Sequence, residues 1–131
     1  MRGAAIDTHA LIFYLSAPRK LGKSAAHWLR DAEAGRAQVV VPSAVAIELV
    51  LLREAGRKVV GAAEVGALLA VQPSFSLLAL DLDQSLEFAL LGSLPELFDR
   101  LIVAAARTAG VSLITRDAVI CDSGLVETIW D

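Results

Sequence analysis

The sequence predicts an α/β fold, with a parallel sheet of about five strands and helices on both of its faces. Short apolar runs rich in β-branched residues, such as residues 39–41 and 111–115, are typical of buried strands. Stretches with helical spacing separate these runs, and such alternation favours a parallel sheet with right-handed crossovers. With 131 residues and 56% hydrophobic content, the chain can bury the core of a single domain, residues 1–131.

The first predicted elements are a strand and two helices. Residues 3–6 are short and apolar, and the Asp7-Thr8 pair that follows is typical of an N-cap at the start of a helix. A second helix is expected to begin at Ser24, because apolar residues follow it at helical spacing, and to end at Gly35. The chain thus leaves its first strand directly into helical structure.

The middle of the chain predicts another strand followed by two helices. The valine run at 39–41 ends in Pro42-Ser43, which indicates a buried strand and then a helix start. Glu48 falls about a turn and a half into that helix. The Ala- and Val-rich stretch 57–71 predicts a further helix, although its glycines weaken it.

The last third predicts a strand, two helices and two strands, at residues 77–80, 84–91, 100–109, 111–115 and 126–130. Asp83 and Asp99 stand directly before the two helices and are expected to cap them. Gly110 is a typical C-terminal helix stop. These elements complete the sheet of about five strands.

Four acidic residues stand at the edges of apolar stretches: Asp7, Glu48, Asp99 and Asp117. Asp7 and Asp117 follow predicted strands, and Glu48 lies early in a helix that starts at the same edge of the sheet. Asp99 begins a helix that must run back before the next strand. We expect all four at the carboxyl edge of the sheet, where open α/β sheets bind ligands.

Ionised carboxylates near a core are costly unless they are paired or bound to a metal. Oxygen-rich side chains without a Cys/His cluster suit Mg²⁺ or Mn²⁺ better than zinc. Each acid alone also has a structural explanation, as an N-cap, a turn residue or a solvent-facing helix position. Glu48 fits such an explanation least well, because apolar residues flank it on both sides. The four acids are nevertheless expected at the same edge of the sheet, and this favours a shared metal site.

Composition and motifs exclude several other classes. Neither a glycine-rich nucleotide fingerprint nor a Walker loop occurs, and no Ser/His/Asp arrangement is evident. The formal net charge of −3 neither supports nor excludes nucleic acid, because removing the four acids leaves the chain nearly neutral. No uninterrupted apolar stretch reaches the ~18 residues of a membrane span, and the early Asp7 argues against a secretory signal. With the single Cys121, these features favour the cytoplasm.

Four motifs, in chain order, resemble PIN-domain proteins of the VapC toxin type: I-D-T-H-A-L at 6–11, S-x4-E at 43–48, F-D-R-L-I-V-A at 98–104 and L-I-T-R-D at 113–117. The likeness extends over essentially the whole chain. It implies a three-layer α/β/α PIN-like domain and a Mg²⁺- or Mn²⁺-dependent ribonuclease from a toxin–antitoxin system. It also implies an RNA substrate, a homodimer and a cognate antitoxin protein as inhibitor.

The resemblance also implies residue roles. The acid positions of the family match Asp7, Glu48, Asp99 and Asp117, and its small hydroxyl residue near the last acid matches Thr115. We expect Asp7 and Asp99 to be the first metal ligands, with the other two acids completing the cage directly or through water, and metal-activated water to cleave the RNA phosphodiester.

One segment departs from the resemblance, and one alternative function stays open. Residues 94–98 (L-P-E-L-F) lack the basic residues that often precede the third acid in the related subgroup, which affects the choice of substrate. The alternative is a PIN-fold module that binds RNA or a protein partner without cleaving RNA.

Overall fold

The computed structural model describes residues 2–131 and contains a five-stranded parallel sheet with the strand order β3-β2-β1-β4-β5. The strands are β1 (Gly3–Ile6), β2 (Gln38–Pro42), β3 (Phe75–Leu78), β4 (Ser112–Ile114) and β5 (Thr128–Ile129). The order reverses between β1 and β4, because β2 and β3 extend from one side of β1 while β4 and β5 extend from the other. This switch point opens a crevice at the carboxyl ends of β1 and β4.

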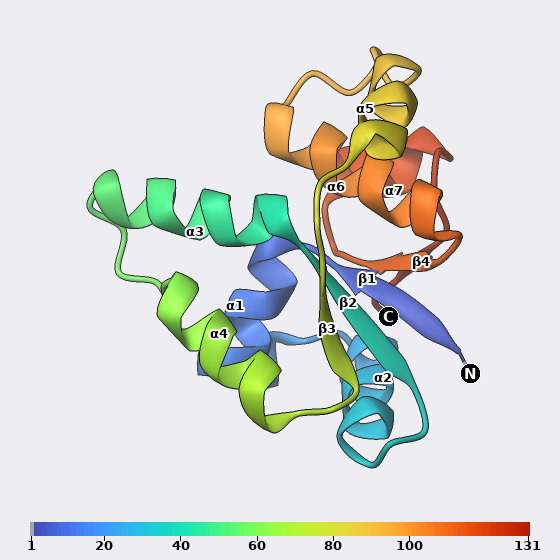
Figure 1. Cartoon of the computed structure of the whole chain (residues 1–131). Coiled ribbons are helices and arrows are strands. Elements are labelled where there is room, and N and C mark those ends of the chain that lie inside the picture. The colour runs from blue at the N-terminus through green and yellow to red at the C-terminus, as the bar shows by residue number, and fades with distance from the viewer. Residues whose placement is uncertain (1) are drawn as a thin grey trace.

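In the described part of the chain, seven α-helices and one short 3-10 helix connect these strands: α1 (Thr8–Ser16), η1 (Pro18–Lys20), α2 (Lys23–Glu33), α3 (Ser43–Glu54), α4 (Ala62–Val71), α5 (Leu82–Ala89), α6 (Leu97–Ala109) and α7 (Ala118–Ser123). Helices α1, α2 and α4 lie on one side of the sheet, and α5, α6 and α7 lie on the other (Figure 1). The predicted three-layer α/β/α fold with a parallel sheet is confirmed. None of the helices within residues 2–131 is long and apolar enough to cross a membrane.

The core lies on both faces of the central strand β1. Ala4, Ala5 and Ile6 have no exposed surface, and β1 pairs with β2 on one side and β4 on the other. Helix α6 covers one face with five consecutive buried residues, Ile102–Ala106, three of which are alanines. Small side chains allow the backbone of α6 to approach the sheet closely, which fixes the position of its first turn.

Several helix starts differ from the prediction. Helix α4 begins at Ala62 rather than at residue 57, because the carboxylate of Glu64 accepts a hydrogen bond from the backbone N–H of Gly61 and fixes the start there. The cap of α5 is Asp81, two residues before the predicted Asp83. Strand β3 likewise lies two residues earlier than predicted, with Phe75 buried opposite Val39.

Two further caps were assigned to the wrong residue. Glu96 caps α6, and its carboxylate accepts hydrogen bonds from the backbone N–H groups of Phe98 and Asp99. Helix α2 begins one residue before Ser24, whose hydroxyl instead donates to the backbone carbonyl of Asp131. The side chain of Asp99 is therefore not used as a cap and is available to face the crevice.

Gly22 lies where the end of the chain packs against the start of α2. The carbonyl of Trp130 accepts a hydrogen bond from the N–H of Ala25, and a Cβ atom on Gly22 would lie 2.2 Å from that carbonyl oxygen. The φ of −63° at Gly22 suits any residue, so the obstacle is steric.

We expect Gly22→Ala to lower the free energy of unfolding by about 1–3 kcal/mol, because the backbone of Trp130, directly after β5, must move to admit the methyl group. Gly66→Ala is the matched control: Gly66 lies within α4 with no atom within 4 Å of the added Cβ, so the change should stabilise by about 0.5–1 kcal/mol. Urea unfolding of both variants measures the difference. Equal stability of Gly22→Ala and wild type would contradict this packing.

Candidate active site

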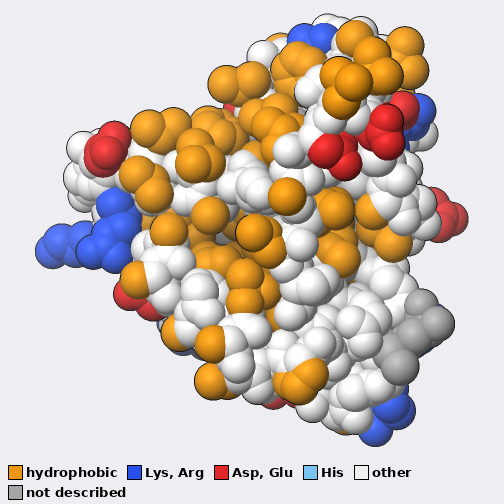
Figure 2. Space-filling view, in the orientation of Figure 1, with side chains coloured by type: hydrophobic (Ala, Val, Ile, Leu, Met, Phe, Trp, Pro, Cys, Tyr) orange, Lys and Arg blue, Asp and Glu red, His pale blue; other side chains and the backbone are white. Residues whose placement is uncertain are grey.

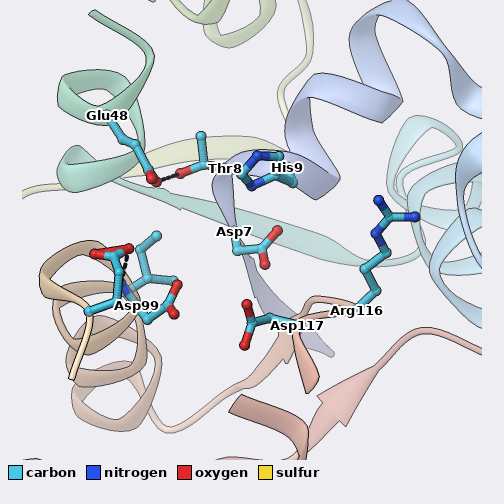
Figure 3. Close-up of a pocket in the computed structure, with 9 residues that line it drawn as sticks. Asp7, Thr8, His9, Glu48, Asp99, Arg116 and Asp117 are labelled. Atoms are coloured by element: carbon cyan, nitrogen blue, oxygen red, sulfur yellow. Dashed lines mark hydrogen bonds between the residues drawn. The ribbon is translucent and has the colours of Figure 1, made fainter. Parts of the chain in front are cut away.

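A cavity of about 360 Å³ lies at the carboxyl edge of the sheet, at the switch point between β1 and β4. All four acids singled out in the sequence line it, although they come from four separate parts of the chain (Figure 3). The full lining consists of Asp7, Thr8, His9, Glu48, Glu96, Asp99, Ile102, Arg116 and Asp117. The expected common edge is therefore found.

Asp7 is the most deeply placed of the four acids. It follows β1 directly and caps α1: its Oδ1 accepts a hydrogen bond of 2.8 Å from the N–H of Ala10. Its Oδ2 accepts a hydrogen bond from the hydroxyl of Thr115, which has no exposed surface. The hydroxyl oxygen of Thr115 also accepts the N–H of Asp117 at 3.0 Å. Thr115 thus joins the ends of β1 and β4 and holds both aspartates in place.

Asp117 caps α7, a helix that the sequence reading missed. Its Oδ1 accepts a hydrogen bond of 3.0 Å from the N–H of Ile120, whose side chain is fully buried. Gly124 ends this helix with a left-handed φ of 68°. The signal that could have predicted this short helix is an aspartate followed three residues later by an apolar residue, with a glycine after the last turn.

Glu48 extends toward the cavity from α3 and accepts a hydrogen bond from the hydroxyl of Thr8. Thr8 is buried, so its hydroxyl is fixed in position. Sequence reasoning assigned no role to Thr8, because the two residues are 40 positions apart and only the fold brings them together. The solvent-facing alternative for Glu48 does not hold, since its side chain is half-buried, lines the cavity and is bonded to Thr8.

Asp99 lies in the first turn of α6, half-buried against the cavity. Burial and the negative charges of Asp117, Glu96, Glu48 and Asp7 raise the pKa of Asp99 to about 7. Burial also raises the pKa of Asp7, and this effect outweighs the opposing hydrogen bonds from Thr115 and Ala10. The carboxylates therefore repel one another across the cavity, and a cation between them would relieve that repulsion.

The acids surround the cavity without forming a closed cage. Within residues 2–131, no group of three or more His, Cys, Asp or Glu side chains is close enough to hold a metal ion directly. The all-oxygen donor set fits a hard cation that keeps several of its own waters. The amino ends of α1 and α7 also meet the cavity, and their positive helix dipoles partly offset the negative charge.

The remaining lining residues give the cavity distinct sides. His9, in the first turn of α1, is exposed at the rim, where the sequence reading assigned it no role. Ile102 of α6 supplies an apolar wall. Arg116 is the one arginine among the lining residues, and it stands beside Asp117 at the outer edge (Figure 3). The cavity is thus acidic inside with basic groups along one rim.

Three solved structures are similar in fold. A chain from the crystal structure of VapBC2 from Rickettsia felis, bound to a DNA fragment from their promoter, has a TM-score of 0.72 at 14% identity, covering 98% of this chain and 99% of that chain. A toxin-antitoxin complex from Klebsiella pneumoniae gives a TM-score of 0.63 at 21% identity, with 94% of each chain covered. FitAcB from Neisseria gonorrhoeae gives 0.64 at 18% identity, with 95% of each covered.

Comparison with curated proteins gives no match. The sequence profile of the PIN domain, in contrast, matches residues 4–123, which include every residue that lines the cavity. The chain therefore belongs to the PIN domain family.

Proposed function

We propose that this PIN-domain protein is a Mg²⁺- or Mn²⁺-dependent endoribonuclease, the toxin of a VapC-type toxin–antitoxin system. The observation that carries the proposal is the convergence of Asp7, Glu48, Asp99 and Asp117 on one cavity at the switch point of the sheet. A carboxylate cluster of this kind is suited to hold a divalent cation against an RNA phosphate.

Asp7 and Asp99 are proposed as the first metal ligands, since one stands at the end of the central strand and the other opens the helix packed on it. Asp117 and Glu48 complete the site, directly or through water. When bound, a divalent cation supplies an activated water and stabilises charge on the phosphate and the leaving oxygen. Thr115 keeps Asp7 fixed, and Thr8 directs Glu48 so that its second oxygen is free to orient water.

A protein partner is part of the proposal. One of the three similar structures is a toxin-antitoxin complex, and the other two are VapBC2 and FitAcB, which supports a cognate antitoxin for this chain. Exposed leucines on α5 and exposed apolar residues on α3 gather on one face of the molecule (Figure 2). Leu82 on α5 and Leu90 directly after it are each 73% exposed, and an apolar patch of this kind favours coverage by an antitoxin or by a second copy in a homodimer.

The test is RNA cleavage by purified protein freed of any partner. With Mg²⁺ or Mn²⁺ we expect cleavage of a structured RNA, and with EDTA we expect none. In cells, expression of the chain alone should arrest growth, and a co-expressed antitoxin should relieve the arrest. RNA binding without cleavage under any divalent cation would reject the enzyme and favour the non-cleaving PIN-fold module. Cleavage that persists in EDTA would reject the metal mechanism.

A further inference from the structure

Arg116 is an arginine that stands beside an acidic cavity and pairs with none of its acids. The residue is exposed, and it directly precedes Asp117. Within residues 2–131 its side chain has no ion pair within 4.0 Å and no hydrogen bond. Its guanidinium carbon instead lies 4.7 Å from the ring centroid of Phe13. In Figure 3 the side chain of Arg116 extends away from the carboxylates of Asp7 and Asp117.

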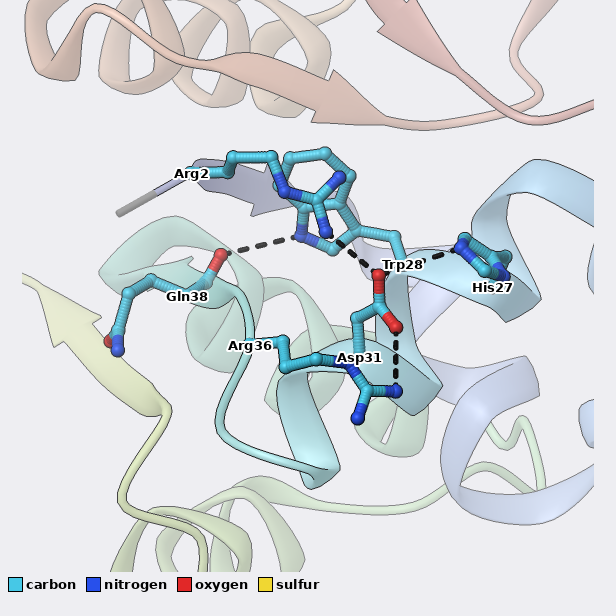
Figure 4. A network of polar contacts seen from close by, with 6 residues as sticks. All are labelled: Arg2, His27, Trp28, Asp31, Arg36 and Gln38. Atoms are coloured by element: carbon cyan, nitrogen blue, oxygen red, sulfur yellow. Dashed lines mark hydrogen bonds and ion pairs between the residues drawn. The ribbon is translucent and has the colours of Figure 1, made fainter.

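Two other arginines of the chain form hydrogen-bonded ion pairs with an aspartate. Arg2 and Arg36 donate to the two oxygens of Asp31, at 2.7 and 3.0 Å (Figure 4). These hydrogen bonds lower the pKa of Asp31, with Arg36 the largest cause. They tie α2 to the segments that precede β1 and β2, so their donors serve the fold. The donors of Arg116 have no such structural use, although carboxylates are near.

Phe13 holds a second cation. The Nζ atom of Lys20 lies 5.5 Å from the centroid of the same ring, and Lys20 also has no ion pair within the described chain. Phe13 itself is 8% exposed and contacts Trp130, with 6.3 Å between the ring centroids. The ring is therefore a fixed support, and cation–π attraction holds Arg116, which lines the cavity, and Lys20, which lies outside its lining, against the same side chain.

The negative side chains of the cavity and the positive side chains held by Phe13 lie next to each other without pairing. Five carboxylates line the cavity, whereas Arg116 on its rim and Lys20 on the same Phe13 ring have no acidic partner among residues 2–131. An RNA strand whose scissile phosphate lies over the acids still needs positive partners for its adjacent phosphates. About half or more of the hydrogen bonds between proteins and nucleic acids go to the sugar–phosphate backbone. Arginine suits this contact because its guanidinium can form bidentate hydrogen bonds to a phosphate.

We infer that Arg116 and Lys20, supported by Phe13, form a phosphate-binding ledge that holds the RNA backbone beside the scissile bond. This inference rests on the proposed ribonuclease function and names substrate-binding residues for it. Arg116 is the principal contact, because its planar guanidinium offers several donors while one face stays on the ring. The ledge reads no base, so it contributes affinity and strand position rather than sequence preference.

The test compares Arg116→Gln with Arg57→Gln, a matched loss of one charge in the connection between α3 and α4. For cleavage of one short RNA with Mg²⁺, we expect Arg116→Gln to raise KM by about tenfold, with kcat within about twofold of wild type, because backbone binding is lost while the chemistry is kept. Arg116→Lys should recover part of the loss in KM, and Arg57→Gln should match wild type.

A binding measurement in EDTA separates this inference from the function on which it rests. Fluorescence anisotropy of a labelled single-stranded RNA, followed across a salt titration, should show weaker binding by Arg116→Gln and a log–log salt slope smaller by about one. Wild-type protein that binds RNA without cleaving it, with this change of slope, would reject the ribonuclease proposal and keep the ledge. Unchanged KM and unchanged salt slope in a folded Arg116→Gln variant would overturn the ledge, as would a wild type that binds no RNA.

Discussion

Asp7→Asn is expected to lower the rate of RNA cleavage by at least about 100-fold, a loss as large as or larger than those caused by disturbing the neighbours of metal ligands. The fold should survive, because asparagine caps helices as well as aspartate does and can still accept the N–H of Ala10. The charge that would bind a divalent cation is lost. Cleavage rates and thermal melts, measured on the same preparations, separate the two effects.

Asp81→Asn is the control for this prediction. Asp81 caps α5 in the same way, accepting the N–H of Gln84 at 2.9 Å, but it does not line the cavity. An ordinary N-cap and a proposed metal ligand therefore receive the same chemical change. Asp81→Asn should cleave RNA at the wild-type rate. A comparable rate for Asp7→Asn would mean that Asp7 is only a cap.

Without metal, the protein should become more stable as the pH is lowered from about 8 to about 6. The pKa of Asp99 is about 7 in the folded chain, above its ordinary value of 3.8, so the folded state takes up a proton in this range while the unfolded state stays ionised. Stability then falls as the pH rises through the folded pKa. The groups that repel Asp99 are Asp117, Glu96, Glu48 and Asp7.

Mg²⁺ should remove this destabilisation at pH 8. A ligand that binds the folded state at 100 times its Kd adds about 2.7 kcal/mol of stability, so the melting temperature should rise with Mg²⁺. Asp99→Asn in EDTA should be as stable as wild type or more stable at pH 8, with a weaker response to both protons and Mg²⁺. Melts of both proteins at pH 6 and 8, with EDTA or Mg²⁺, measure these effects. Wild-type melts that ignore both pH and Mg²⁺ would contradict a shared carboxylate site.

The parts of the fold that the sequence predicted well are those determined by local chemistry. The strand at 3–6 ends at the N-cap of α1 and lies at the centre of the sheet. Its apolar composition and the N-cap signal therefore predict the same bounds. The valines of β2 are buried or half-buried between β1 and β3, as their composition indicates. Placing each acid relative to such an element was enough to predict that all four meet at one edge.

The errors arose where two local choices compete and distant contacts decide. Asp81 and Asp83 are both acceptable caps for α5, and the donation from the Gln84 side chain to the carbonyl of Ala79 accompanies the earlier start. Glu96 and Asp99 compete in the same way at α6, where the longer side chain of Glu96 reaches back to the first N–H groups. Hydrophobic spacing alone does not separate such alternatives.

Contacts between residues far apart in the chain could not be predicted from the sequence for a different reason. The bond from Thr8 to Glu48 and the stacking of Arg116 on Phe13 each join separate elements, and no local pattern encodes the pairing. Thr115 lies buried and hydrogen-bonds to Asp7 and to the backbone of Asp117, while its role in the site stays a prediction. Its connection to Asp7, 108 positions away, follows only from the pairing of β1 with β4.

The most direct test of the carboxylate site is Mn²⁺ binding to the purified protein, followed by electron paramagnetic resonance at pH 8 without RNA. This measurement reports the cation itself rather than cleavage or stability. Wild type and Asp81→Asn should bind Mn²⁺ with equal affinity, and Asp99→Asn should bind at least about 10-fold more weakly, because a proposed ligand is lost. Equal binding by all three proteins, or no binding by wild type in the millimolar range, would contradict the proposal that these acids form a metal site.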